Sequence, residues 1–116
     1  MLSFSIIRQL ITIVGEDRLL LEAEDFQHYG IDRTTIWQAN PCAVILPGSI
    51  GEVQQIVLLA KELNLAIVPS GGRTGLSGGA VAKDGEIVVA LDRLNDIREF
   101  NPLDRTVTVG AGMITE

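Results

Sequence analysis

Glycine is concentrated in one short part of this chain. Five of the nine residues from 71 to 79 are glycine, with serine and threonine interleaved. Glycine has no Cβ and reaches positive φ angles, so the N–H groups of such a run can converge on an anion. The apolar segment 65–69 before it predicts a buried strand, and strand ends are where α/β proteins usually bind ligands. We therefore interpret the run as a phosphate-binding loop.

Two common phosphate-binding patterns do not fit this run. A Walker loop needs a lysine and then serine or threonine after its last glycine, but Gly79 is followed by alanine and valine. A dinucleotide fingerprint needs glycines at positions i, i+2 and i+5, but the residue two places after Gly71 is Arg73. Residues 86–91 then predict a strand rather than the helix that would hold a pyrophosphate. The pattern argues against a nucleoside triphosphatase and against a Rossmann domain.

The composition limits the size and the partners of the domain. A chain of 116 residues with 47% apolar residues can bury one modest core, so we expect at most one domain. The net charge of −6 argues against nucleic-acid or anionic-membrane partners and favours a small molecule. Cys42 is the only cysteine, which fits a reducing compartment such as the cytoplasm. Residues 1–14 are apolar but interrupted by Arg8, so they predict neither a signal peptide nor a membrane span.

Residues 1–40 predict a helical lead-in and a connecting loop. The apolar spacing at 5–14 predicts an amphipathic helix that ends at Gly15. Residues 16–25 are charged and of uncertain form, and the pattern loses its periodicity from residue 26 to residue 41. We expect an ordered loop there.

Residues 41–116 predict a βαβ unit followed by antiparallel strands. Ser49 and Glu52 have the spacing of a capping box, which places a helix start between two apolar strand segments. The two strands that flank this helix are expected to be parallel. In chain order the expected elements are a strand at 43–46, a helix at 51–64, strands at 65–69 and 87–91, and a hairpin of 97–100 with 106–110. The fold class is α+β, with α/β character in its N-terminal part.

Several polar residues outside the glycine run are interpreted as structural. His28 has no neighbours in the sequence that suit a base or a metal ligand, so it predicts a surface residue. Tyr29 and Asp32 predict a loop tethered by a tyrosine hydroxyl and an Asx-turn. The charges around the hairpin, Asp92 and Arg93 among them, are expected on the surface.

Segments in a fixed order carry a resemblance to a known family. They are Pro41-Cys-Ala-Val-Ile-Leu-Pro47, the capped helix, Ala66-Ile-Val-Pro-Ser-Gly-Gly-Arg-Thr-Gly-Leu-Ser-Gly-Gly79, Val89-Ala-Leu-Asp-Arg-Leu-Asn95 and Val107-Thr-Val-Gly-Ala-Gly112. The series is similar to the N-terminal part of FAD-linked oxidases of the vanillyl-alcohol oxidase and p-cresol methylhydroxylase type. Its Thr-Gly-Leu-Ser-Gly-Gly run most resembles the branch with glycolate oxidase large subunit, D-lactate dehydrogenase and D-2-hydroxyglutarate dehydrogenase. The resemblance implies the first subdomain of a p-cresol methylhydroxylase type FAD-binding fold, incomplete within 41–116.

The resemblance implies which residues hold FAD. In this family the equivalent loop wraps the FAD pyrophosphate with main-chain N–H groups and a few hydroxyls. Pro69 would hold the loop entrance, and Thr74 would offer a hydroxyl. The implied cofactor-binding residues are Pro69, Ser70, Gly71, Gly72, Arg73, Thr74, Gly75, Ser77 and Gly78.

Arg73 bears on how the flavin is attached. Family members that tether their flavin covalently at this loop carry a histidine at this position. Arginine cannot form that bond, so the resemblance predicts noncovalent, dissociable FAD. Two positions of the Arg73 side chain stay open here, one facing a phosphate and one in solvent.

The resemblance also implies a reaction. It implies oxidation of a 2-hydroxy acid by hydride transfer to the flavin, with the base, the substrate-binding arginines and any metal ligands located beyond residue 116. We therefore name no catalytic and no metal-binding residue in this chain. Homo-oligomerisation, other subunits and peripheral membrane contact stay open. The alternative is a free-standing domain that binds a nucleotide or phosphate metabolite without catalysis.

Overall fold

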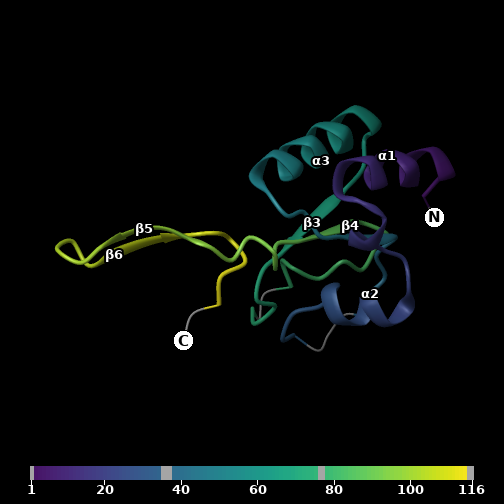
Figure 1. Ribbon diagram of the computed structural model, residues 1–116. Coiled ribbons are helices and arrows are strands. Elements are labelled where there is room, and N and C mark those ends of the chain that lie inside the picture. Colours follow the sequence, from purple (N-terminus) through teal and green to yellow (C-terminus); the bar gives the residue numbers. More distant parts are fainter. Residues whose placement is uncertain (1, 35–37, 76–77, 115–116) are drawn as a thin grey trace.

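The computed structural model describes residues 2–34, 38–75 and 78–114. Its helices are α1 (Phe4–Val14), a short 3₁₀ helix η1 (Glu16–Arg18), α2 (Ala23–Tyr29) and α3 (Ile50–Leu63). Its strands are β1 (Leu19–Leu20), β2 (Ala43–Ile45), β3 (Ile67–Ser70), β4 (Ile87–Ala90), β5 (Ile97–Asn101) and β6 (Thr106–Val109). Figure 1 shows a sheet between helices, with a hairpin that extends away from it.

Four strands form one sheet in the order β1-β2-β4-β3. Val88 of β4 is in register with Val44 of β2 on one side and with Val68 of β3 on the other, and both pairings are parallel. β1 pairs antiparallel with β2 at the edge. The predicted β2-α3-β3 unit is therefore present with parallel strands, but β4 lies between them. All four residues of β4 are buried, which suits a central strand of a sheet that is covered on both faces.

Side chains of the sheet alternate between two cores on opposite faces. One core, under α1 and α3, contains Leu10, Leu19, Ala43, Ile45, Ile56, Ile87 and Val89. The other core contains Val44, Leu46, Val68, Ala82, Val88 and Ala90, with Phe26 and Tyr29 of α2 packed against it. Figure 1 shows the corresponding layers, with α1 and α3 on one face and α2 on the other. Residues 1–40, which the sequence predicted as a lead-in, therefore contribute Leu10 and Leu19 to the first core and pack Phe26 and Tyr29 against the second.

The ends of the two long helices follow local sequence signals. Ser49 Oγ accepts a hydrogen bond from Glu52 N at 3.2 Å, as the capping box predicted. Glu52 Oε1 accepts from Gly48 N at 3.1 Å, so the reciprocal bond reaches the residue before the cap rather than the cap itself. α1 ends at Val14 and is capped by Gly15, whose φ is 94°. No helix within the described ranges is long and apolar enough to cross a membrane.

Helix α2 corrects part of the expected connecting loop. The sequence from residue 26 predicted a loop, but the helix continues to Tyr29. Phe26 and Tyr29 are three residues apart, so they lie on one face of the helix and pack against the second core. This burial stabilises a helix that the short, mostly polar segment did not predict.

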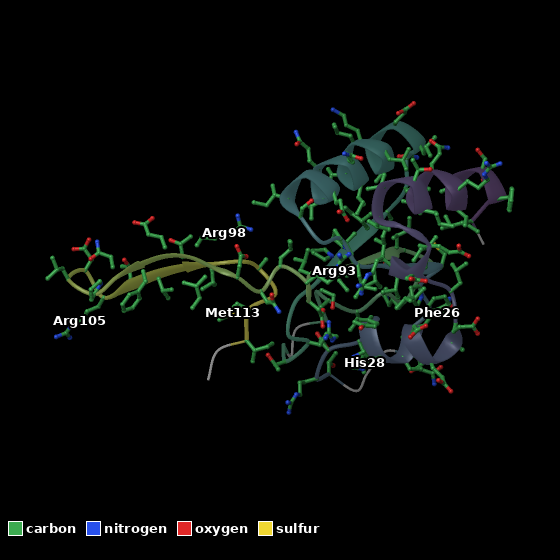
Figure 2. All side chains as sticks on the ribbon, viewed as in Figure 1. Phe26, His28, Arg93, Arg98, Arg105 and Met113 are labelled. Atoms are coloured by element: carbon green, nitrogen blue, oxygen red, sulfur yellow. The ribbon has the colours of Figure 1, made fainter. Side chains whose placement is uncertain are left out.

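β5 and β6 form the predicted antiparallel hairpin. Asn101 Oδ1 accepts hydrogen bonds from Leu103 N at 3.1 Å and Asp104 N at 3.2 Å, which closes the turn. Figure 2 shows Arg105 at the tip of the hairpin, far from the body. Phe100 is 69% exposed and Leu103 is 93% exposed. The hairpin therefore presents apolar surface.

Candidate functional site

The glycine loop leaves the sheet at the carboxyl end of β3. Pro69 and Ser70 belong to this strand, so the loop begins at Gly71. Because β2, β4 and β3 are parallel, their carboxyl ends lie at the same edge of the sheet. Leu91 N donates to Ser70 O at 2.9 Å, which brings the turn after β4 beside the loop. The loop therefore lies at a strand end, as the sequence predicted.

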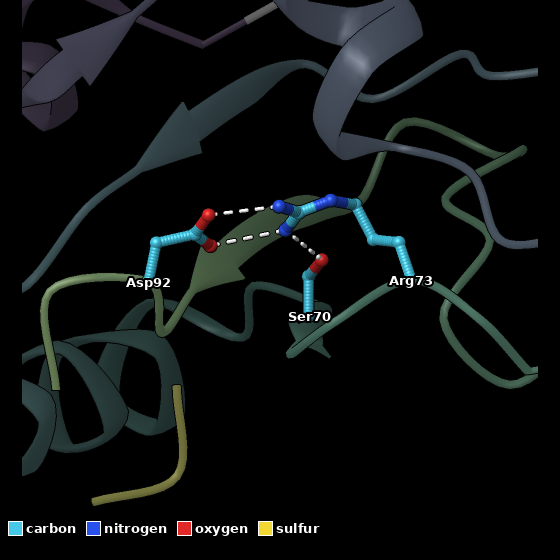
Figure 3. Close-up of polar contacts among 3 residues, drawn as sticks. All are labelled: Ser70, Arg73 and Asp92. Carbon is cyan, nitrogen blue, oxygen red and sulfur yellow. Dashed lines mark hydrogen bonds and ion pairs between the residues drawn. The ribbon is translucent and has the colours of Figure 1, made fainter. Parts of the chain in front are cut away.

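Arg73, Ser70 and Asp92 are joined by polar contacts at this edge (Figure 3). Arg73 Nη2 donates to Asp92 Oδ2 at 2.8 Å, and Nη1 donates to Asp92 Oδ1 at 3.0 Å. Nη1 also donates to Ser70 Oγ at 3.1 Å, and Ser70 is fully buried. Paired bonds from one guanidinium to one carboxylate are among the strongest polar contacts in proteins. The loop is thus attached to the end of β4 through a side chain.

Arg73 is largely buried in spite of its charge. Its side chain is 15% exposed, and its guanidinium carbon lies 4.9 Å from the centre of the Tyr29 ring. The hydrogen bond to Asp92 raises the pKa of Arg73 above its usual value, although burial acts in the opposite direction. The side chain does not lie in solvent, one of its two expected positions, and its guanidinium is directed at a carboxylate. Tyr29 contributes its ring face here, and the expected tether through its hydroxyl is not found among the described residues.

Asp32 holds the other end of the loop. Its Oδ1 accepts a hydrogen bond from Thr34 N at 2.8 Å, which confirms the predicted Asx-turn. Its Oδ2 accepts from Gly78 N at 3.0 Å. Arg33 N also donates to Gly75 O at 2.9 Å. Since Asp32 is a buried residue, these bonds tie the loop to the segment that follows α2.

We expect Asp32→Asn to lower the free energy of unfolding by about 2 kcal/mol. The new amide NH₂ group would face one of the two N–H donors that the carboxylate now accepts. Urea unfolding followed by circular dichroism measures the change. Asp84→Asn, the same charge change at an exposed residue, is the control and is expected to stay within about 0.5 kcal/mol of the parent. Equal unfolding midpoints for the two variants would contradict the role of Asp32.

Packing within the chain does not account for most of the loop glycines. In the described part of the loop, Gly78 alone among the glycines has a positive φ, at 80°. A Cβ added at Gly71 or Gly72 would meet no atom closer than 3.6 Å, and one at Gly75 no atom closer than 3.9 Å. Alanine would therefore fit the fold at these three positions. Because glycine has no side chain, a ligand from outside this segment can approach the main chain closely at these positions.

The same stretch offers hydrogen-bond donors. Within the described ranges, the N–H groups of Gly71, Gly72 and Thr74 make no hydrogen bond, and Thr74 is exposed. Beside them lies a hollow of about 540 Å³, lined by Gly71, Asp92, Asn95, Gly112, Met113 and Ile114. Ser77, another expected site residue, lies outside the described residues. Bare glycines with available N–H groups fit a phosphate-bearing ligand such as a pyrophosphate.

Other side chains of the described ranges form no metal site. No group of three or more His, Cys, Asp or Glu residues is placed there to hold a metal ion. His28 is exposed, as expected, and packs edge to face against Tyr29 with ring centres 4.5 Å apart. The Cys42 thiol is half-buried, and this burial raises its pKa.

Asp92 and Arg93 were expected to be surface charges, and the structure places both half-buried, with 36% of the Asp92 side chain exposed. Asp92 binds Arg73 on the β3 side, while Arg93 Nη1 donates to Leu46 O at 2.8 Å, just beyond β2. The sequence contained one sign that Asp92 and Arg93 belong to the site. Both residues follow a buried strand, and residues that follow the strands of a parallel sheet lie together at its carboxyl edge. The missing information was the strand order. With β4 in the centre, consecutive residues reach the ends of both neighbouring strands.

A comparison with protein families agrees with this geometry. Residues 41–116 match the FAD binding domain family. The chain belongs to this family. Membership confirms the resemblance to FAD-linked oxidases and identifies FAD as the cofactor of the domain. The glycine loop, with its bare main chain and available N–H groups, fits the pyrophosphate of that cofactor.

The FAD-binding chain has close relatives among named enzymes. It is 57% identical over 99 residues to D-2-hydroxyglutarate dehydrogenase of Xanthomonas citri pv. viticola, a match that covers 85% of this chain and 21% of the relative. It is 44% identical over 111 residues to the enzyme of the same name from Stutzerimonas stutzeri, covering 96% of this chain and 24% of the relative. The chain spans less than a quarter of the length of these relatives.

Solved structures share the fold at low sequence identity. p-Cresol methylhydroxylase with substrate bound has a TM-score of 0.79 at 20% identity, covering 94% of this chain and 22% of that chain. Alkyldihydroxyacetonephosphate synthase has a TM-score of 0.85 at 18% identity, covering 98% of this chain and 23% of that chain. These matches confirm the expected α+β fold of the p-cresol methylhydroxylase type.

Proposed function

We propose that this chain binds the pyrophosphate of FAD in a flavin-dependent dehydrogenase that oxidises a 2-hydroxy acid, with D-2-hydroxyglutarate as the first candidate substrate. The observation that carries the proposal is the glycine loop at the carboxyl edge of the sheet, whose glycines at 71, 72 and 75 are bare although the fold would accept alanine. The high identity to two D-2-hydroxyglutarate dehydrogenases supports this substrate over glycolate and D-lactate.

The residues of this chain bind and orient rather than react. The available N–H groups of Gly71, Gly72 and Thr74 would hold the pyrophosphate of FAD, and the Thr74 hydroxyl would add a further donor. Bound flavin supplies the acceptor for the hydride that leaves the substrate α-carbon. We assign no catalytic base to this chain. The Arg73 guanidinium is bonded to Asp92, and arginine forms no flavin linkage, so we propose that FAD dissociates from the folded protein.

The test uses the full polypeptide that the gene encodes. We expect the purified protein to be yellow, to release its flavin into the supernatant on acid precipitation, and to reduce a dye with D-2-hydroxyglutarate faster than with D-lactate or glycolate. Flavin that stays with the precipitate would contradict noncovalent binding. A protein that binds a phosphate compound but no FAD, and reduces no dye, would instead support a non-catalytic phosphate-binding domain.

We propose a cytoplasmic location for the protein. The single cysteine, Cys42, is a free thiol, and free thiols persist in reducing compartments. Cell fractionation with an antibody against the protein tests this location, and recovery in a secreted or membrane fraction would contradict it.

A further inference from the structure

We propose that Asp92 is a positioning residue for the cofactor loop, which it holds through Arg73, and that Arg73 therefore acts on FAD through the conformation of the loop rather than by contact with a phosphate. This inference rests on the proposed binding of FAD. It assigns a role to two charged residues that lie at the edge of the sheet where the loop begins. The pair fixes the loop before the cofactor arrives.

The backbone of the loop requires such support. Arg73 has a φ of 60°, a left-handed conformation that few residues other than glycine adopt without cost. Its paired bonds to Asp92, at 2.8 and 3.0 Å, and its bond to Ser70 Oγ, at 3.1 Å, offset that cost. Figure 3 shows that the guanidinium spans the gap between the loop and the turn after β4. Without Asp92 the loop would relax away from this conformation.

The positive charge of the loop is already paired within the chain. Arg73 is the only charged residue between 69 and 82, and Asp92 neutralises it at ion-pair distance. The guanidinium face is covered by the Tyr29 ring, and 15% of the side chain is exposed. A pyrophosphate at this loop would therefore meet main-chain N–H groups and the Thr74 hydroxyl as its available donors, not an uncommitted cation. Arg73 acts through the shape of the loop.

The direction in which Asp92→Asn changes the affinity for FAD distinguishes a positioning role of Asp92 from a purely electrostatic one. Asp92→Asn removes a negative charge near the anion, which by charge alone would tighten FAD binding and would free Arg73 to reach a phosphate. If Asp92 instead positions the loop, the same substitution weakens FAD binding. We expect a dissociation constant about tenfold higher, because a charge-assisted contact that orders the binding conformation is lost.

The measurement is a fluorescence titration of FAD into the full polypeptide after its flavin has been removed. Asp96→Asn is the matched control, since it makes the same charge change in an exposed ion pair with Arg98 at 3.5 Å. We expect the control to stay within about twofold of the parent. Tighter or unchanged FAD binding by Asp92→Asn overturns the inference. Failure of the unsubstituted protein to bind FAD would instead overturn the proposed function itself.

A second variant keeps the test decisive if Asp92→Asn does not fold. Arg73→Lys retains the positive charge but loses the paired geometry, so we expect about the same tenfold loss as for Arg73→Gln. We also expect the salt dependence of FAD affinity to be the same in Arg73→Gln and in the parent, because no direct contact between cation and phosphate is removed. Near-parental affinity of Arg73→Lys, or a clearly weaker salt dependence in Arg73→Gln, would show that Arg73 binds the phosphate directly.

Discussion

Gly72→Val is expected to weaken FAD binding at least about a hundredfold while the free energy of unfolding stays within about 1 kcal/mol of the parent value. A Cβ at Gly72 would meet only Ile114 Cδ1, at 3.6 Å, and Gly72 is exposed, so the two methyl groups of valine can turn toward solvent. In the proposed complex, however, the same side chain would occupy the space next to the main chain where the FAD pyrophosphate binds. The branched side chain would hold the pyrophosphate away from the N–H groups, and several charge-assisted hydrogen bonds would be lost together.

Two measurements on the full polypeptide separate these effects. FAD affinity is obtained by fluorescence titration of the flavin-free protein, and stability by urea unfolding of the same sample. Gly51→Ala is the control, because Gly51 is an exposed residue of α3, outside the glycine loop, and a Cβ there meets no atom closer than 3.8 Å. Parental FAD affinity in Gly72→Val would mean that the bare main chain at this position does not face the cofactor.

Gly112→Ala is expected to have the opposite profile, with a loss of about 3 kcal/mol or more in the free energy of unfolding. Its Cβ would overlap the carbonyl oxygen of Leu91 and lie 2.6 Å from the carbonyl carbon. Both atoms are backbone, so no side-chain rotation can relieve the contact. Gly112 N also donates to Leu94 O at 2.8 Å, which holds this segment close to the turn after β4.

The substitution should therefore damage both the fold and the site. Moving the turn displaces Asp92, so we expect FAD affinity to fall together with the unfolding midpoint. Differential scanning calorimetry of the flavin-free protein gives the stability change without contribution from the cofactor. Gly51→Ala again serves as the control. An unfolding midpoint within 1 °C of the parent, roughly the scale of a negligible stability change, would contradict the close approach at Gly112.

The glycine-rich segments of this chain thus have two different physical origins. At Gly71, Gly72 and Gly75 a Cβ would fit, which indicates a requirement imposed by an external group. At Gly112 a Cβ would collide with the main chain, which indicates a requirement of the fold. The sequence alone shows glycine in both places and cannot separate the two. Only the positions of neighbouring backbone atoms do so.

Local patterns were sufficient to predict most of the elements. The capping box at Ser49, the apolar spacing of α3 and the turn at Asn101 each depend on residues a few positions apart. Helix α2 was missed because its stability comes from Phe26 and Tyr29 packing against a distant core. The same limit applies to its neighbour Asp32, whose Asx-turn was predictable but whose bond to Gly78 was not.

By itself, the sequence determined that a glycine loop follows a buried strand, that a capped helix precedes this strand, and that the series resembles FAD-linked oxidases. These conclusions depend on composition and short-range spacing. The tertiary structure alone decided that β4 lies between β2 and β3, and therefore that Asp92 reaches Arg73 across 19 positions of sequence. Strand order results from competition among distant segments for burial on both faces of the sheet, and no short-range pattern records the outcome.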